Sequence, residues 1–332
     1  MSAGAAARRE NAPRPDLAVF TTELETLSMP MSNPRIPYRL ASDAPALPAP
    51  NGKPLIVHIV LNLEHWSFDQ PMPRALFAAP HNRIPSPDLA NFSWVEYGLR
   101  LGVPRLVRVL KERGLPASAT MNVSVIDVYP RCAETALEEG WEIIGHTIVQ
   151  RSLQLEENEV GIIQQTAERL KKFTGKRPRG WLGPGFGETM ETLEHLKAAG
   201  FDHVYDWMVD DVPCWMTTRR GPMIAMPYAL ELNDVTIFLL GKNPGREYYE
   251  CFRDTVEMLE PELKTHPRVL TLGLHPHIIG VPHRLKYLAR TLDMLARRRD
   301  TIFMTGSQIA DWFIKHSKPD AAKAARGAKR RR

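Results

Sequence analysis

Short apolar runs alternate with amphipathic stretches from about residue 55 to residue 316. The clearest run is residues 55–63, whose β-branched and other apolar residues predict a strand buried on both faces. Further strands are predicted at 117–121, 141–145, 180–182, 202–205, 223–226, 236–240, 269–274 and 301–304. Helices are predicted between them at 103–113, 130–139, 156–173, 189–199, 246–264, 283–297 and 306–316. This alternation predicts a parallel sheet, and the number of strands predicts its closure into a barrel.

Polar groups follow the apolar part of the first strand. Asn62 and Glu64 are two residues apart, so an extended chain places their side chains on the same side. His65 and Trp66 come directly after them. This pattern is typical of a barrel strand that ends in an active site at the barrel mouth. The alternative is a core strand that runs into a solvated loop.

Two later predicted strands also end in polar groups. His146 follows one of them and His275 follows another. A single histidine after a strand is more often structural than catalytic. Two histidines at corresponding strand ends, with Glu64 on a third, favour a site that binds a metal or transfers protons.

Regions outside this alternation predict the domain organisation. Residues 1–50 are rich in Pro, Ala and Ser and predict a loosely ordered arm, residues 51–316 the barrel, and residues 317–332 a basic, disordered tail. The Pro-rich run 67–94 predicts a long loop over the barrel mouth.

Charge and composition narrow the function classes. The formal net charge is +5, but residues 315–332 hold eight Lys or Arg and one acid, so the rest of the chain is weakly negative. We therefore expect no nucleic-acid partner. No apolar run is long enough to insert in a membrane. A Gly-rich phosphate loop is missing after the first strand, which disfavours a dinucleotide fold.

The cysteines and the first residues bear on location. Cys132, Cys214 and Cys251 are widely spaced with no disulfide or metal pattern, and residues 1–15 do not read as a secretory signal. We expect a cytoplasmic protein, a small-molecule substrate and a homo-oligomer.

Several stretches resemble, in order, the polysaccharide deacetylase superfamily with its NodB homology domain. They begin at Asn62, Trp94, Gly140, Arg177, Pro227 and Leu274, and include Gly140-Trp-Glu-Ile-Ile-Gly-His and Leu274-His-Pro-His-Ile-Ile-Gly-Val-Pro. The likeness is greater to the branch of metal-independent allantoinases and peptidoglycan deacetylases. It implies an α/β fold, a deformed (β/α) barrel of about seven strands, over residues 55–315.

The resemblance also implies catalytic roles, with departures from the family pattern. Metal-dependent members use two aspartates on the first strand and a His-x-x-x-His pair. Here the aspartate positions are occupied by Asn62 and Glu64, and the pair by His146 and Gln150. An amide is a poor zinc ligand, so Glu64 and His146 would hold a metal weakly or not at all. We expect no cofactor, with zinc or another divalent metal as the alternative. His275 matches the family histidine thought to act as a general acid.

Further candidates each have a structural alternative. Asp206, Asp210 and Asp211 form an acidic cluster in which Asp211 could replace the base missing at Asn62, or could be solvated. Candidate substrate-binding residues are Trp66, Trp181, Asn233, Asp234 and Arg179. The tryptophans could be core residues, the Asn-Asp pair a turn, and the arginine a solvated loop residue.

These patterns predict a hydrolase of non-peptide carbon–nitrogen amide bonds. The expected substrate is a small cyclic amide or ureide such as allantoin, with Glu64, His146 and His275 at the centre. One alternative is a metal-dependent N-deacetylase of an N-acetylated sugar or polysaccharide. Another is a catalytically degenerate barrel with a binding role, and Asn62 and Gln150 support this alternative.

Overall fold

The computed structural model describes residues 32–78 and 83–319. The chain divides into two units between Tyr38 and Arg39. In the described part of the first unit, the Asn33 side chain accepts hydrogen bonds from the backbone N–H groups of Arg35 and Ile36. Most of the predicted arm and most of the predicted tail lie outside the described residues, so those domain boundaries stay predictions.

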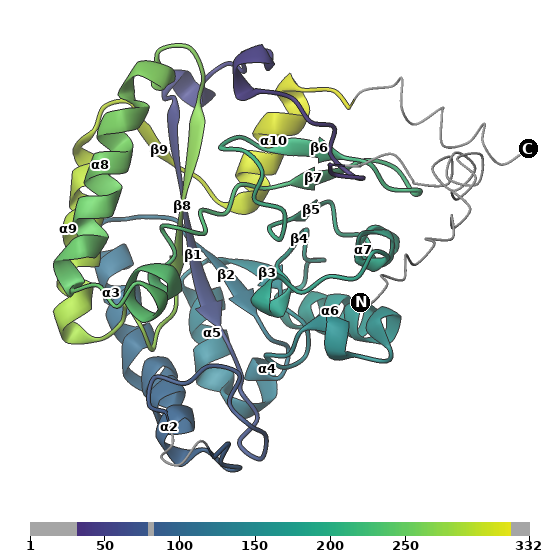
Figure 1. Cartoon of the computed structure of the whole chain (residues 1–332), viewed down its shortest axis with the longest axis vertical. Helices are drawn as coiled ribbons and strands as arrows, with labels where there is room; N and C mark the ends of the chain where they lie inside the picture. The colour runs from purple at the N-terminus through teal and green to yellow at the C-terminus, as the bar shows by residue number, and fades with distance from the viewer. Residues whose placement is uncertain (1–31, 79–82, 320–332) are drawn as a thin grey trace, which may run out of the picture. The chain divides into compact units, whose positions relative to one another are not determined.

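The second unit is built on a curled sheet of nine strands (Figure 1). The strand order is β6-β7-β5-β4-β3-β2-β1-β8, with β9 also paired to β1. All pairs are parallel except β6 with β7. The strands are β1 (Leu55–Leu63), β2 (Ser118–Met121), β3 (Glu142–Gly145), β4 (Gly180–Trp181), β5 (His203–Val204), β6 (Cys214–Met216), β7 (Met223–Ala225), β8 (Arg268–Leu274) and β9 (Thr301–Phe303). The predicted α/β deformed barrel is confirmed, with more strands than the seven or so expected.

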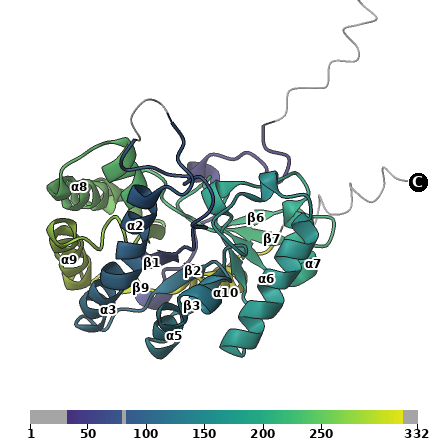
Figure 2. The same ribbon diagram turned by 90° about the horizontal axis from the view of Figure 1, so that it is seen from below.

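Helices cover the outer face of this sheet (Figure 2). The α-helices of the described residues are α2 (Leu89–Tyr97), α3 (Val103–Lys111), α4 (Val125–Val128), α5 (Pro130–Glu138), α6 (Glu159–Thr174), α7 (Thr192–Ala199), α8 (Gly245–Leu263), α9 (Pro282–Arg297) and α10 (Gly306–His316). Helix α10 differs because it packs its Ile309 and Phe313 side chains against the inner face. Within the described ranges, no helix is both long and apolar enough to cross a bilayer.

Strand β1 separates the two faces of the sheet. All nine of its residues are buried. The odd-numbered side chains, such as Leu61, join the core beneath the outer helices. The even-numbered side chains point to the barrel interior, where Ile56 and Val60 pack with residues of β7 and α10. Asn62 and Glu64 continue this inward series, as the period of two requires.

A polar cluster lies at the amino ends of the strands, inside the barrel. His58 lies 2.9 Å from the Ser118 hydroxyl, which donates to Glu142 at 2.8 Å. Glu142 in turn accepts hydrogen bonds from the backbone N–H and side chain of Ser307. A carboxylate at a helix N-terminus is favourable, so this cluster fixes α10 in the barrel.

Three local predictions need correction. Residues 236–240 were expected to form a strand, but Val235–Leu240 is a π-helical turn whose Phe238 ring stacks on Tyr248 of α8. A short apolar run fits either structure, and contact with α8 decides it. The long loop ends earlier than predicted, because α2 begins at Leu89. The antiparallel strand β6 was not predicted.

Candidate active site

Glu64, His146 and His275 meet at the barrel mouth, the edge formed by the carboxyl ends of the parallel strands. The Oε1 atom of Glu64 lies 3.5 Å from Nε2 of His275 and 4.0 Å from Nε2 of His146. All three side chains are buried. The predicted juxtaposition of a carboxylate with two imidazoles is therefore present in the structure.

Asp234 holds His275 at Nδ1, on the side of the ring opposite Glu64. This Nδ1 lies 2.6 Å from Oδ1 of Asp234, and the His275 backbone N–H donates to Oδ2 of the same carboxylate at 2.7 Å. Burial by itself would lower the pKa of His275, but the charges and hydrogen bonds of Asp234 and Glu64 raise it to about 9. His275 is thus an imidazolium at neutral pH.

Glu64 remains an anion inside the protein. Trp66 donates its indole N–H to Oε2 at 2.9 Å, and Gln150 donates to Oε1 at 3.0 Å. Burial opposes ionisation, yet the charge and hydrogen bond of His275, with the charge of Arg74, hold the pKa of Glu64 well below its ordinary value. Trp66, predicted to bind substrate, thus orients this carboxylate, and its contact with a substrate stays a prediction.

His146 has the opposite protonation state to His275. Its Nδ1 hydrogen-bonds the backbone carbonyl of Leu182, and burial lowers its pKa. The neutral ring then carries the proton at Nδ1, which leaves a lone pair at Nε2. This Nε2 is buried without a hydrogen-bond partner among the described residues and lies on the Glu64 side.

Asn122 fixes the spacing between the first and third strands. Its side-chain oxygen accepts the backbone N–H of His65 at 2.9 Å, and its side-chain nitrogen donates to the carbonyl of His146. One buried amide therefore ties the residue after Glu64 to the backbone of His146. The next residue, Thr147, has a φ of 58°, an uncommon value for a β-branched residue that marks a constrained turn.

Asn62 and Asn233 belong to the supporting structure. Asn62 accepts from Thr120 and donates to Tyr228 and to the Leu274 carbonyl. Asn233 also donates to the Tyr228 hydroxyl. Both amides are buried. Asn233 and Asp234, predicted to bind substrate, hydrogen-bond Tyr228 and His275, and their role in substrate binding stays a prediction.

Three other predicted residues lie away from the mouth. The backbone carbonyl of Asp211 accepts from Val269 at the amino end of β8, about 20 Å of strand from His275. Asp211 therefore lies far from Asn62, whose missing base it was predicted to replace. Arg179 precedes β4 and binds Asp202 and Asp311 at 2.8 Å each, also at the amino end. Trp181 is fully buried on the outer face, with its ring against Phe201.

Asp206, from the same acidic cluster as Asp211, does lie at the carboxyl end of the sheet. It follows β5 and accepts the Gly183 N–H at 2.8 Å. Burial and the neighbouring Glu188 carboxylate raise the pKa of Asp206 well above its ordinary value. Asp206 and Glu188 are thus two neighbouring carboxyl groups near the rim of the mouth.

His277 and Arg74 complete the mouth and were not predicted. The His277 ring lies edge-on to Trp66 and Trp94, with centroids 5.9 and 4.6 Å away. Burial lowers the pKa of His277 to about 3, so it is neutral. Arg74 lies over the Trp66 ring, with its guanidinium carbon 5.6 Å from the centroid. Arg74 lies in an aperiodic Pro-rich loop, so no pattern in the sequence pointed to it.

The donor set does not fit tightly held zinc. Such sites need at least three good ligands, and Glu64 and His146 supply two. Gln150 stands where a second imidazole would complete the set, and it donates to Glu64. Among the described residues, no group of three His, Cys, Asp or Glu side chains is placed to hold a metal ion. A metal would therefore be held weakly at this site.

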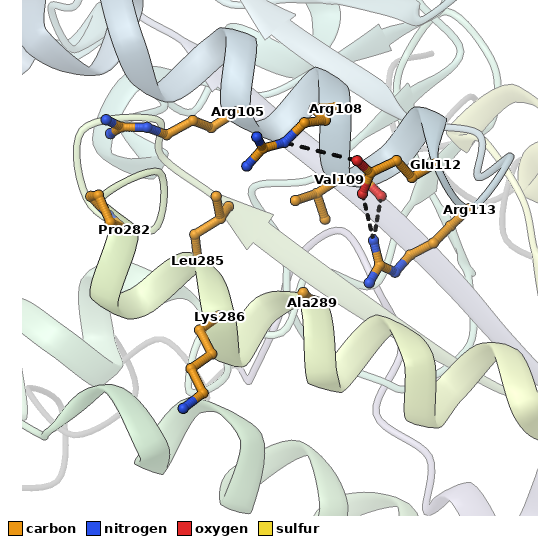
Figure 3. A pocket seen from close by; sticks show the side chains of 9 residues that line it. All are labelled: Arg105, Arg108, Val109, Glu112, Arg113, Pro282, Leu285, Lys286 and Ala289. Carbon is orange, nitrogen blue, oxygen red and sulfur yellow. Dashed lines mark hydrogen bonds and ion pairs between the residues drawn. The ribbon is translucent and has the colours of Figure 1, made fainter.

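A separate pocket of about 390 Å³ lies between α3 and α9 (Figure 3). Its charged lining includes Arg105, Arg108 and Arg113, which are partly satisfied by neighbours such as Glu112 and the Gly280 carbonyl. None of the three central mouth residues lines it. The pocket is therefore not the site formed by the strand ends.

Known proteins share this sequence pattern and fold. Residues 94–204 match the profile of the family described as Polysaccharide deacetylase. Over these residues the chain is similar to the polysaccharide deacetylases. A Schizosaccharomyces pombe protein described as "Putative polysaccharide deacetylase" is 25% identical over 300 residues, covering 81% of this chain and 93% of that protein. The predicted family resemblance is confirmed.

Solved structures agree with the polysaccharide deacetylase fold. The crystal structure of PuuE allantoinase has a TM-score of 0.76 at 23% identity, covering 86% of this chain and 98% of that one. A structure from Pseudomonas aeruginosa PAO1, titled "probable Polysaccharide deacetylase", has a TM-score of 0.72 at 24% identity, covering 82% and 95%. At sequence identities of 23–24%, this structural similarity shows that the fold is shared.

Proposed function

We propose that this polysaccharide deacetylase relative hydrolyses the C–N bond of a small cyclic amide or ureide, a class that includes allantoin. One observation carries the proposal: the buried carboxylate of Glu64 lies within 4.0 Å of Nε2 of both His275, whose pKa is raised, and His146, whose pKa is lowered. Amide hydrolysis requires a general acid and a general base close together. Here the surroundings of the two histidines give them different pKa values, so one can act as the acid and the other as the base.

The three residues divide the work as follows. His146 takes a proton from a water molecule at its free Nε2 while the water oxygen bonds to the amide carbon. Glu64 stabilises the imidazolium that forms at His146. His275 then donates its Nε2 proton to the leaving nitrogen as the C–N bond breaks. The products are a carboxyl group and a free amine or urea nitrogen.

Turnover assays on the full chain test this proposal. We expect ring opening of allantoin or of unsubstituted hydantoin or dihydrouracil, with activity that survives a chelator. His146→Gln and His275→Gln should each lower kcat about 100-fold or more, as loss of acid–base catalysis does. His316→Gln, at an exposed histidine on α10, is the matched control. Absence of turnover on every ring tested would contradict the proposal.

A second candidate is a metal-dependent N-deacetylase of an N-acetylated sugar or polysaccharide. The family profile and the S. pombe relative support it. So do two buried atoms without hydrogen-bond partners among the described residues, Nε2 of His146 and Oε1 of Gln150, in side chains that both approach Oε1 of Glu64. Acetate release from N-acetylglucosamine oligomers, dependent on added zinc and abolished by a chelator, would place this function first.

A further inference from the structure

Arg74 reaches over the mouth from the loop between β1 and α2. Its guanidinium stacks on Trp66, the residue whose indole N–H holds Glu64. The positive charge of Arg74 also contributes to the low pKa of Glu64 and of His277, so it acts on the catalytic centre. Arg74 is therefore a mouth residue although it comes from a loop.

The guanidinium has unused hydrogen-bonding capacity. Its Nη1 is buried and has no hydrogen-bond partner in the described parts of the chain. No carboxylate of the described residues lies within ion-pair distance of Arg74. A buried charged donor without an acceptor is costly, and a bound ligand that accepts from it would remove that cost.

Contacts on both sides hold this part of the loop in place. Asn91 of α2, a buried residue, accepts the backbone N–H groups of Leu76 and Phe77 at 2.8 and 3.0 Å and donates to the Phe77 carbonyl. Before Arg74, the Phe68 ring lies edge-on to Phe92 at 5.0 Å. Arg74 is thus positioned before any ligand arrives, which lowers the entropy cost of binding.

We propose that Arg74 is a specificity-determining residue that binds a carboxylate group of the substrate. The planar guanidinium matches a carboxylate in both charge and geometry. The substrate class is then a cyclic amide or ureide that carries a carboxylate, such as hydantoin-5-acetate. The reaction named in this inference rests on the proposed function. The binding of a carboxylate at Arg74 does not depend on it.

A pair of substrates that differ in one group tests Arg74 by turnover. Hydantoin-5-acetate and its carboxamide have nearly equal size and differ in charge. We expect Arg74→Gln to raise KM for the acetate about 10- to 100-fold more than KM for the carboxamide, the loss typical of a charged hydrogen bond. Arg74→Lys should recover part of the loss. An equal effect on both compounds would overturn the inference.

Binding without turnover separates this inference from the proposed reaction. Hydantoin-5-acetate and succinate are titrated calorimetrically into the full chain, Arg74→Gln and Arg83→Gln. Arg83 is an exposed arginine of the same loop and serves as the matched control. Binding that is lost only in Arg74→Gln supports the inference even if no ring is opened. No binding to the unmodified chain, or equal binding to all three, refutes it.

Discussion

The carboxylate of Asp234 contacts His275 twice, at its ring Nδ1 and at its backbone N–H. One contact fixes where the proton of the imidazole resides, and the other fixes the end of β8. Neither of these two contacts involves Glu64 or His146. Its effect on chemistry should therefore pass through His275.

Replacing Asp234 by Asn tests this relationship. The amide keeps the shape but removes the charge that raises the pKa of His275. We expect kcat to fall about 100-fold or more, as when a general acid is lost. The alkaline limb of the kcat–pH profile, set by His275 near pH 9, should also move to lower pH. A lower rate with an unmoved alkaline limb would mean that Asp234 acts only on structure.

The raised pKa of His275 also predicts how stability depends on pH. The folded pKa is about 9 and the unfolded pKa about 6.5, so the folded state binds the proton more tightly. This stabilisation is fully present below pH 6.5 and is lost as pH rises through 9, about 3 kcal/mol over the range. Urea unfolding of the full chain and of His275→Gln from pH 6 to 9.5 measures it. A difference between the two that stays constant with pH would contradict the assignment.

Gln150→His should create a zinc site. The Gln150 side chain already reaches Oε1 of Glu64, the atom that His146 faces. A second imidazole there completes a set of three good ligands. We expect the variant to retain about one equivalent of zinc after dialysis, measured by elemental analysis, and the unmodified chain to retain much less. Gln154→His, at an exposed position nearby, is the control.

Gly98 should not tolerate a side chain. An added Cβ would overlap the backbone nitrogen and Cα of His277, because the π-helical turn Gly98–Gly102 lies directly against the residues after β8. We expect Gly98→Ala to lower the free energy of unfolding by about 1–3 kcal/mol, the usual cost of overpacking. Leu101→Ala, at a half-exposed position in the same turn, should cost much less. Thermal unfolding of both variants makes the comparison.

The sequence predicted the centre of the site because strand periodicity is local. Glu64 and the two histidines follow apolar runs, and parallel strands bring their carboxyl ends to one edge. Asp211 and Arg179 were misplaced because an aperiodic loop does not show at which end of the sheet its residues lie. Residues 236–240 were mispredicted because contact with α8, distant in sequence, decides their structure.

Arg74 could not be predicted for a different reason. Its place over Trp66 depends on Asn91, which lies in another element and hydrogen-bonds the loop backbone. Side-chain contacts to loop backbone leave no periodic trace in the sequence. Such residues are found only once the fold is known.

The strict alternation of β1 has a consequence for insertions and deletions. Within this strand, the addition or loss of a single residue would exchange the two sets of side chains across the sheet. Glu64 would then turn toward the outer helices, and the apolar side chains that pack beneath them would enter the catalytic mouth. Length changes in natural relatives should therefore be absent from residues 55–64 and should concentrate in the loop that follows.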